Sequence, residues 1–329
     1  MDYLSLLQHL NACHGPAGDE QEIANKLKEF AEPYADECYF DTMGNLIVRK
    51  KASGPKVLFA AHMDSLGLIV THIEKNGYLR VGKIGGIHLH SILHTPFRFK
   101  NGVTAVIALS EKVKEKDMTL QDLYLDIGAK TKEEAEKMVQ IGDTAVSYMP
   151  AFSMGRQLVS PYMDNRISCI ILLEVLQQIK SHTNDLYFVF TVQEELGMRG
   201  AKTAAFRIDP AYGIAVDVTP ADALDSKHTS SSVLGKGAAI KVMDNSVICH
   251  PQVVEQLTQL AETQGIVCQR DIISSGGTDA GTIHLSRMGV LTGGISVPCR
   301  YVHSPVESVD VGDVQACAKL LRAFAEASL

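Results

Sequence analysis

Residues 186–195 read LYFVFTVQEE, and this stretch decides the fold that we expect. The apolar residues 186–190 are typical of a strand buried inside a sheet. The acids Glu194 and Glu195 follow shortly afterwards, and open α/β sheets carry their chemistry beyond the carboxyl ends of their strands. A Glu-Glu pair alone is more typical of a solvated helix start, where the helix dipole favours negative charge. The pair therefore indicates a functional site only if other predicted strands also end in polar residues that could join it.

Three further apolar runs also end at or near potential metal ligands. The runs and their polar residues are 56–61 with His62 and Asp64, 213–218 with Asp217, and 290–298 with His303. Each polar residue also has a simpler interpretation, as part of a turn, a loop cap or an exposed loop. Together they supply imidazole and carboxylate groups, which are the ligand types of a hydrolytic metal site.

One more acid stands at the start of a helix. Asp164 precedes an apolar helical pattern over residues 167–176. Asp is a preferred N-cap residue, so the simpler interpretation is structural. Because the other candidates converge, we include Asp164 among the potential ligands.

The order of predicted elements indicates an α/β fold with an insertion. Helical patterns cover residues 20–27, 165–176, 253–264 and 311–327, and they alternate with the apolar strands. This alternation predicts a mostly parallel sheet flanked by helices. Short apolar pieces and glycine-rich turns over residues 67–155 predict a small β-rich domain inserted into the catalytic domain, which then comprises residues 1–66 and 156–329.

Composition is that of a large protein with a sizeable core. Of its 329 residues 46% are apolar, and a chain of this length is expected to form two domains. The net charge of −7 argues against a nucleic-acid partner. No apolar run approaches the ~20 residues of a membrane span, and the N-terminus lacks signal-peptide features, so we expect a cytoplasmic protein without a membrane partner. Seven cysteines, none spaced Cys-x-x-Cys, predict reduced thiols.

Five motifs in a fixed order carry a family resemblance. They are AHMD at 61–64, MDNR at 163–166, QEELGMRGA at 193–201, VDVT at 216–219 and RYVHSP at 300–305. Together they resemble the tetrahedral aminopeptidase family of dinuclear metallopeptidases, also called the glutamyl aminopeptidase or cellulase-M-like family. The resemblance spans almost the whole chain, including residues 122–129 and 276–281.

The resemblance implies two metal sites that share one carboxylate. The implied ligands are His62, Asp164, Glu195, Asp217 and His303, with Asp164 bridging the two metals. His62 and Asp217 would complete one site, and Glu195 and His303 would complete the other. Mixed imidazole and carboxylate ligands suit zinc or cobalt, with manganese as a further candidate.

Two more acids would act without binding metal. Asp64 would hold the ring of His62, and Glu194 would be the general base, a role worth roughly 10²–10⁴ in rate. Two divalent cations bring four positive charges, and three ligand carboxylates return three negative ones. The remaining positive charge would stabilise a hydroxide that bridges the metals and, later, a tetrahedral oxyanion.

The resemblance also implies substrates and assembly. The substrates would be short peptides, from which N-terminal residues are removed. The insertion would drive dimerisation, and the dimers would form a tetrahedral dodecamer whose active sites face an inner chamber. Members of the family differ in the N-terminal residue that they prefer, so this preference is not predicted.

Two other functions are compatible with the same motifs. A deacylase or carboxypeptidase could use the same pair of metals, and it would differ from an aminopeptidase by accepting substrates without a free α-amine. A catalytically silent scaffold is the alternative from another class, although every implied ligand and the implied base are present. The histidines of residues 88–94 could suggest another metal cluster, but no acids lie near them in sequence, so we expect a surface or interface there.

Overall fold

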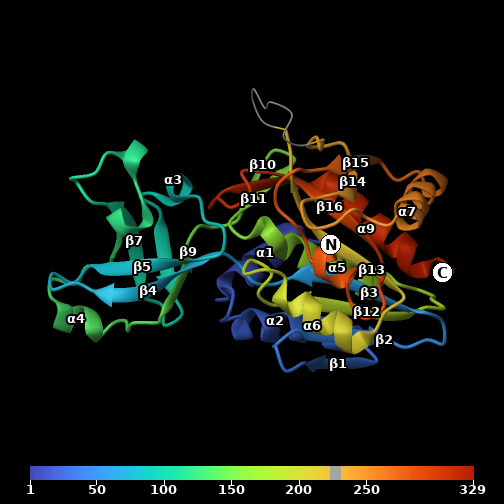
Figure 1. The fold of residues 1–329 in the computed structure, drawn as a ribbon, viewed down its shortest axis with the longest axis horizontal. Coiled ribbons are helices and arrows are strands. Elements are labelled where there is room, and N and C mark those ends of the chain that lie inside the picture. Colours follow the sequence, from blue (N-terminus) through green and yellow to red (C-terminus); the bar gives the residue numbers. More distant parts are fainter. Residues whose placement is uncertain (223–230) are drawn as a thin grey trace.

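The computed structural model describes residues 1–222 and 231–329. It consists of an α/β body and a smaller closed β-barrel, which lies at the left of Figure 1. The predicted α/β class with a small β-rich unit is confirmed. The predicted domain bounds at 66/67 and 155/156 stay a prediction.

The large sheet is mixed, with parallel pairing at its centre. Its strands, in spatial order, are β1 (Glu37–Phe40), β2 (Leu46–Lys50), β12 (Asp185–Thr191), β3 (Lys56–His62), β13 (Tyr212–Pro220), β16 (Leu291–Arg300), β17 (Glu307–Asp310), β11 (Gln157–Ser160) and β10 (Phe152–Met154). The four neighbours β12, β3, β13 and β16 are parallel, so their carboxyl ends lie at the same edge. β14 (Ala238–Met243) pairs antiparallel with β16, and β15 (Cys268–Ile272) pairs parallel with β14.

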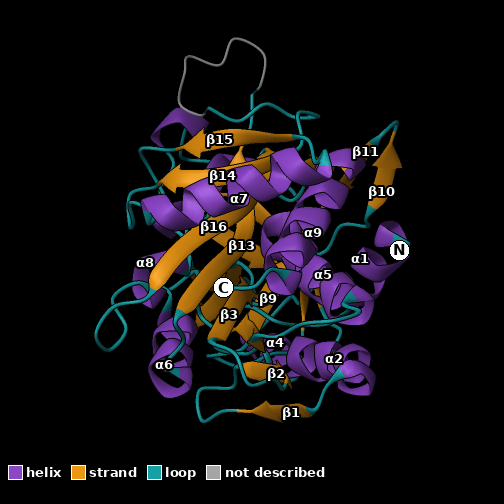
Figure 2. Ribbon diagram, turned by 90° about the vertical axis from the view of Figure 1, so that its right-hand side faces the viewer, coloured by secondary structure: helices purple, strands orange, loops and turns teal. Residues whose placement is uncertain are grey.

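Helices cover both faces of this sheet (Figure 2). One face carries α1 (Tyr3–Ala12), α2 (Gln21–Ala31), α5 (Met163–Gln178), α7 (Pro251–Gln264) and α9 (Val311–Glu326). The other face carries α6 (Arg199–Ile208) and α8 (Ala280–Ile283). Alternate residues of β3 point to opposite faces, so Val57 and Phe59 enter the first core while Leu58 and Ala60 enter the second. Burial on both faces explains why this strand is apolar throughout.

The barrel has its own core. Its strands, in order around the barrel, are β4 (Gly67–Ile73), β5 (Leu79–Ile84), β8 (Leu123–Asp126), β7 (Thr104–Leu109), β6 (Pro96–Phe99) and β9 (Thr144–Ser147). Phe97, Phe99, Ile107 and Leu125 are buried in its interior. Two short helices, α3 (Leu89–Ile92) and α4 (Lys132–Glu136), accompany it. Among residues 1–222 and 231–329, no helix combines the length and apolar character needed to traverse a bilayer.

Candidate metal centre

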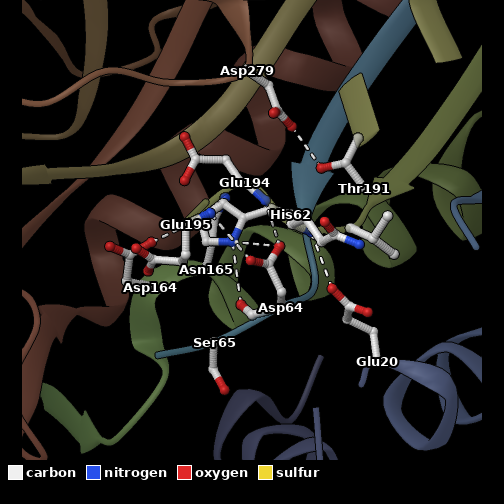
Figure 3. A network of polar contacts seen from close by, with 12 residues as sticks. Glu20, His62, Asp64, Ser65, Asp164, Asn165, Thr191, Glu194, Glu195 and Asp279 are labelled. Atoms are coloured by element: carbon white, nitrogen blue, oxygen red, sulfur yellow. Dashed lines mark hydrogen bonds and ion pairs between the residues drawn. The ribbon is translucent and has the colours of Figure 1, made fainter. Parts of the chain in front are cut away.

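The candidate ligands gather at the edge where the four parallel strands end. His62 is the last residue of β3, Asp217 lies near the end of β13, Glu194 and Glu195 follow β12, His303 follows β16, and Asp164 opens α5. Figure 3 shows the carboxylates of Asp164 and Glu195 beside the ring of His62. The parallel register therefore brings together side chains that are up to 241 positions apart in the sequence, from His62 to His303.

Two groups of side chains share Asp164. Its Oδ1 lies 3.0 Å from Nε2 of His62, and its Oδ2 lies 3.4 Å from Nε2 of His303. His62 Nε2 is also 3.8 Å from Oδ1 of Asp217, and His303 Nε2 is 3.6 Å from Oε2 of Glu195. One group is therefore His62, Asp164 and Asp217, and the other is His303, Asp164 and Glu195.

The donor set fits divalent cations. Ligand atoms of His62, Asp164 and Glu195 all lie within 4.8 Å of one another. Oε1 of Glu195 is buried and has no hydrogen-bond partner, which is costly for a carboxylate unless a cation contacts it. Three carboxylates face two imidazoles, so the cluster is short of positive charge. Divalent cations would supply that charge and would satisfy the orphaned oxygen.

The surroundings of the cluster raise the pKa of two of its carboxyl groups and lower the pKa of the third. Burial, followed by the charge of Asp164, raises the pKa of Glu195 to about 7. Burial also raises the pKa of Asp217 well above its usual value. Burial would raise the pKa of Asp164 too, but its hydrogen bonds to His303 and His62 lower it overall. In the absence of cations the cluster therefore retains protons at neutral pH.

Both histidines are held in the charged form by the acids around them. Burial alone would lower the pKa of His62, but the carboxylates of Asp164 and Asp64 raise it well above its usual value. Burial opposes protonation of His303 as well, yet Asp164 and Glu195 raise the pKa of His303 to about 10. A bound cation would take the place of these protons.

Asp64 connects the histidine to the acidic pair. Its backbone oxygen lies 3.2 Å from Nδ1 of His62, and its Oδ1 lies 3.6 Å from the same nitrogen. The two carboxylate oxygens accept hydrogen bonds from the backbone N–H groups of Glu194 and Glu195, at 3.0 and 3.1 Å. Asp64 is fully buried, so this one side chain fixes the positions of three candidate site residues.

Glu307 is a second buried acid that accepts hydrogen bonds from the backbone of candidate site residues, and the sequence analysis does not predict it. It lies at the start of β17 and is buried. Its carboxylate accepts from the backbone N–H groups of Asp164 and His303, at 2.9 and 2.7 Å. His303 has a left-handed backbone with φ of 65°, a conformation that needs such support. The sequence signals this role only weakly, because Glu307 is the first residue of a four-residue strand that also contains Ser308 and Asp310.

Glu194 lies beside the candidate ligands but takes no part in the close contacts of His62 and His303 with Asp164, Asp217 and Glu195. Burial raises its pKa well above the usual value, and the charge of Asp217 adds to this effect. In Figure 3 its carboxylate lies between the His62 ring and Asp279. Asp279 is buried, and its Oδ2 accepts a hydrogen bond of 2.6 Å from the Thr191 hydroxyl. Glu194 therefore lies beside the cluster and faces the same cavity.

Glu20 is another acid that the sequence analysis does not assign to the site, and it contacts the backbone next to the acidic pair. Its Oε1 accepts from the backbone N–H groups of Gly18, at 2.7 Å, and Gln193, at 3.1 Å. Gln193 precedes the acidic pair and has a φ of 54°. Burial raises the pKa of Glu20 to about 7, with backbone hydrogen bonds opposing the shift. The sequence predicts only a helix that begins at this acid.

A cavity of about 530 Å³ opens next to the cluster. Its lining includes Glu194, the apolar residues Val218 and Ile273, and residues 275–278. The barrel contributes His88, whose ring centroid is 6.1 Å from that of His303. A larger hollow of about 960 Å³ lies elsewhere, between residues 17–19 and the barrel, and none of the candidate site residues lines it. The smaller cavity is therefore the candidate substrate site.

Comparison with known proteins gives consistent matches over the whole chain. The M42 glutamyl aminopeptidase family model matches residues 44–320. A protein from Acetivibrio thermocellus is 43% identical over 97% of each chain. The lysyl aminopeptidase of Pyrococcus furiosus is 37% identical, with 92% of this chain and 91% of that protein covered.

Solved structures show the same similarity. The aminopeptidase APDkam598 from Desulfurococcus kamchatkensis matches with a TM-score of 0.95 at 38% identity, covering 98% of this chain and 94% of that chain. The TET1 peptidase of Pyrococcus horikoshii, which can assemble into a tetrahedron or a large octahedral shell, matches with a TM-score of 0.89 at 30% identity. That comparison covers 98% of this chain and 99% of the other.

Proposed function

We propose a mechanism for this chain, which belongs to the M42 glutamyl aminopeptidase family and is a metal-dependent aminopeptidase, as its five motifs predicted. Two divalent cations would bind to the two groups of side chains that share Asp164. The short distances from Asp164 to His62 and His303 are the observation that carries this proposal. Zinc and cobalt suit the mixed ligands best, and manganese is a further candidate. The substrates would be short peptides that lose their N-terminal residues.

Glu194 and Asp64 would have different roles in the reaction. When bound, the two cations would polarise the scissile carbonyl group and lower the pKa of a water molecule. Glu194 faces the cavity, and its raised pKa suits it to take a proton from water and to pass it to the leaving amine. Asp64 would hold Glu194, Glu195 and His62 in fixed positions relative to one another, since it contacts the backbone or the ring of all three.

We also propose self-association and a cytoplasmic location. Dimers would form through the barrel and would build a tetrahedral dodecamer, as the assembly of the Pyrococcus horikoshii relative supports. All seven cysteines are free, which agrees with a reducing compartment. The net charge of −7 gives no reason to propose a nucleic-acid partner.

The proposed activity is tested with a panel of aminoacyl chromogenic amides. The purified protein is treated with a chelator and then assayed with added zinc, cobalt or manganese. We expect metal-restored release from amides with a free α-amine and none from their N-acetylated counterparts. Equal turnover of the acetylated substrates would overturn the aminopeptidase assignment in favour of a deacylase. Turnover that chelation leaves unchanged would overturn the metal mechanism.

A further inference from the structure

The cavity beside the candidate metal centre carries little charge of its own. Apart from the candidate ligands and Glu194, the described residues that line it include no Lys, Arg, Asp or Glu. The larger hollow beside the barrel is lined by three lysines and three acids, which are Lys83, Lys100, Lys137, Asp19, Glu136 and Asp143. An uncharged lining is therefore a property of the catalytic cavity and not of every hollow in this protein.

This cavity is also the space that a substrate side chain has to enter. Its volume of about 530 Å³ lies within the range of ligand sites, roughly 300–1,000 Å³. A second hollow touches Asp164, Glu195 and His303 from the side of the barrel, but its volume of about 30 Å³ leaves room for only about one or two water molecules. The N-terminal side chain and the rest of a bound peptide would therefore share the larger cavity.

Two apolar side chains form one part of the cavity wall. Val218 follows the candidate ligand Asp217 on β13, and Ile273 follows the end of β15. Both are largely buried, so each presents only an edge to the cavity. The backbone N–H of Ile273 donates to the oxygen of Met243 at 3.1 Å, which fixes this residue against the end of β14. A substrate side chain that covers these edges would remove apolar surface from water, and this favours an apolar side chain.

The neighbouring part of the wall, residues 275–278, is held by contacts with residues 244 and 245. The Thr278 hydroxyl donates to Oδ2 of Asp244 at 3.2 Å, and the backbone N–H of Asn245 donates to the oxygen of Gly276 at 3.0 Å. The hydroxyl of Thr278 is thus engaged with an acid outside the lining of the cavity. This part of the wall is therefore fixed in position and offers no charged side chain to pair with a charged substrate.

We propose that this chain prefers peptides whose N-terminal side chain is apolar and uncharged, such as that of leucine or methionine. The inference rests on the metal-dependent aminopeptidase function proposed above. A charged side chain would lose its water in this cavity without gaining a partner, which costs free energy. The acids of the centre would not supply that partner, because three of them would bind cations and Glu194 would transfer protons.

The test compares substrates that differ mainly in charge. Norleucyl and lysyl chromogenic amides share an unbranched four-carbon side chain, and the lysyl amide adds a terminal ammonium group. We expect kcat/KM of the metal-loaded wild type to be at least about ten-fold higher for the norleucyl amide, and likewise higher for a methionyl than for a glutamyl amide. Equal or higher values for the lysyl or glutamyl amide would overturn this inference and leave the aminopeptidase function standing. No release from any of the four amides would overturn both.

Binding of the free products gives a measurement that does not depend on turnover. Norleucine and lysine are titrated separately into the metal-loaded wild type in a calorimeter. Both carry the same α-amine and carboxylate, so a difference in affinity reports the side chain alone. The dissociation constant of norleucine should be at least about ten-fold lower than that of lysine. Equal constants would count against the proposal.

A charge placed in the cavity wall should change the preference. Ser275 is exposed and lines the cavity, so Ser275→Asp should raise the ratio of lysyl to norleucyl kcat/KM by about five-fold. Ser274→Asp is the matched control, since Ser274 is also exposed but does not line the cavity, and it should keep the wild-type ratio. A ratio is unaffected by the fraction of protein that folds. An unchanged ratio in Ser275→Asp, or an equal shift in both variants, would overturn the assignment of this wall to the substrate side chain.

Discussion

The edge of the large sheet and the interior of the barrel bury side chains of opposite kinds. At the edge, His62, Asp64, Asp217 and Glu307 are all buried within one cluster. In the barrel, whose residues 67–147 are all described, every buried side chain is apolar or a glycine. Burial of apolar side chains is therefore enough to stabilise the barrel core. The edge instead collects negative charge, which destabilises the folded state unless positive charge compensates it.

The edge of the sheet, unlike the barrel, is therefore expected to depend on a bound ligand. Hydrogen bonds from backbone N–H groups to Asp64 and Glu307 hold the edge in shape, but they leave Oε1 of Glu195 without a partner. The barrel has no comparable group in its interior. Removal of metal is therefore expected to change the edge and to leave the barrel core intact.

The largest effect is expected from Asp164→Asn. Asp164 is the carboxylate that both groups share, so its neutralisation should release metal from both and reduce turnover by about 10⁴-fold or more. Metal content by mass spectrometry and amide hydrolysis are the two measurements. Asp117→Asn, an exposed acid of the inserted region, is the control and should behave as wild type. Full metal content in Asp164→Asn would contradict the shared-ligand geometry.

Glu194→Gln separates the base from the ligands. The change preserves the size of the side chain and should reduce turnover roughly 10²–10⁴-fold while the metal content stays at the wild-type level. Glu195→Gln is the natural comparison, since it removes a carboxylate that faces His303 and should lose metal. If Glu194→Gln lost metal and Glu195→Gln kept it, the two roles would have to be exchanged.

Phe99→Ala tests the independence of the barrel. Phe99 is fully buried in the barrel core, so its truncation should cost about 3–5 kcal/mol in the free energy of unfolding of that core. Urea unfolding followed by circular dichroism measures the loss. Under native conditions the metal affinity should remain within about two-fold of wild type. A parallel fall in metal affinity would show that the two regions are energetically coupled.

The smallest effect concerns the pH dependence of metal binding. The pKa of Glu195 is about 7 and that of His303 about 10 in the metal-free protein, so both groups carry protons below pH 7. Cations must displace these protons, and affinity should fall by at least about ten-fold between pH 8 and pH 6. Titration calorimetry in buffers of different ionisation enthalpy would detect the released protons. An affinity independent of pH would contradict the shifted pKa values.

Most of the α/β body could be predicted from local patterns. The helices α2, α5, α7 and α9 follow apolar patterns of helical period, and β3, β12, β13 and β16 follow apolar runs. The candidate ligands could be grouped because parallel strands bring their carboxyl ends to one edge. The roles of these residues in binding and catalysis stay a proposal.

The elements that escaped prediction depend on contacts between distant segments. β14 contains Lys241, which is fully buried and lies 2.5 Å from Asp271 of β15, so a charge interrupts the apolar pattern of each strand. Glu20 and Glu307 bind backbone N–H groups on other elements, and no local pattern signals such a partner.

We propose above that the edge holds two divalent cations through a shared Asp164. The most direct test is the number of cobalt ions bound per chain of wild type after equilibrium dialysis, measured by inductively coupled plasma mass spectrometry. The account predicts two ions per chain. One ion per chain, or none, would contradict it.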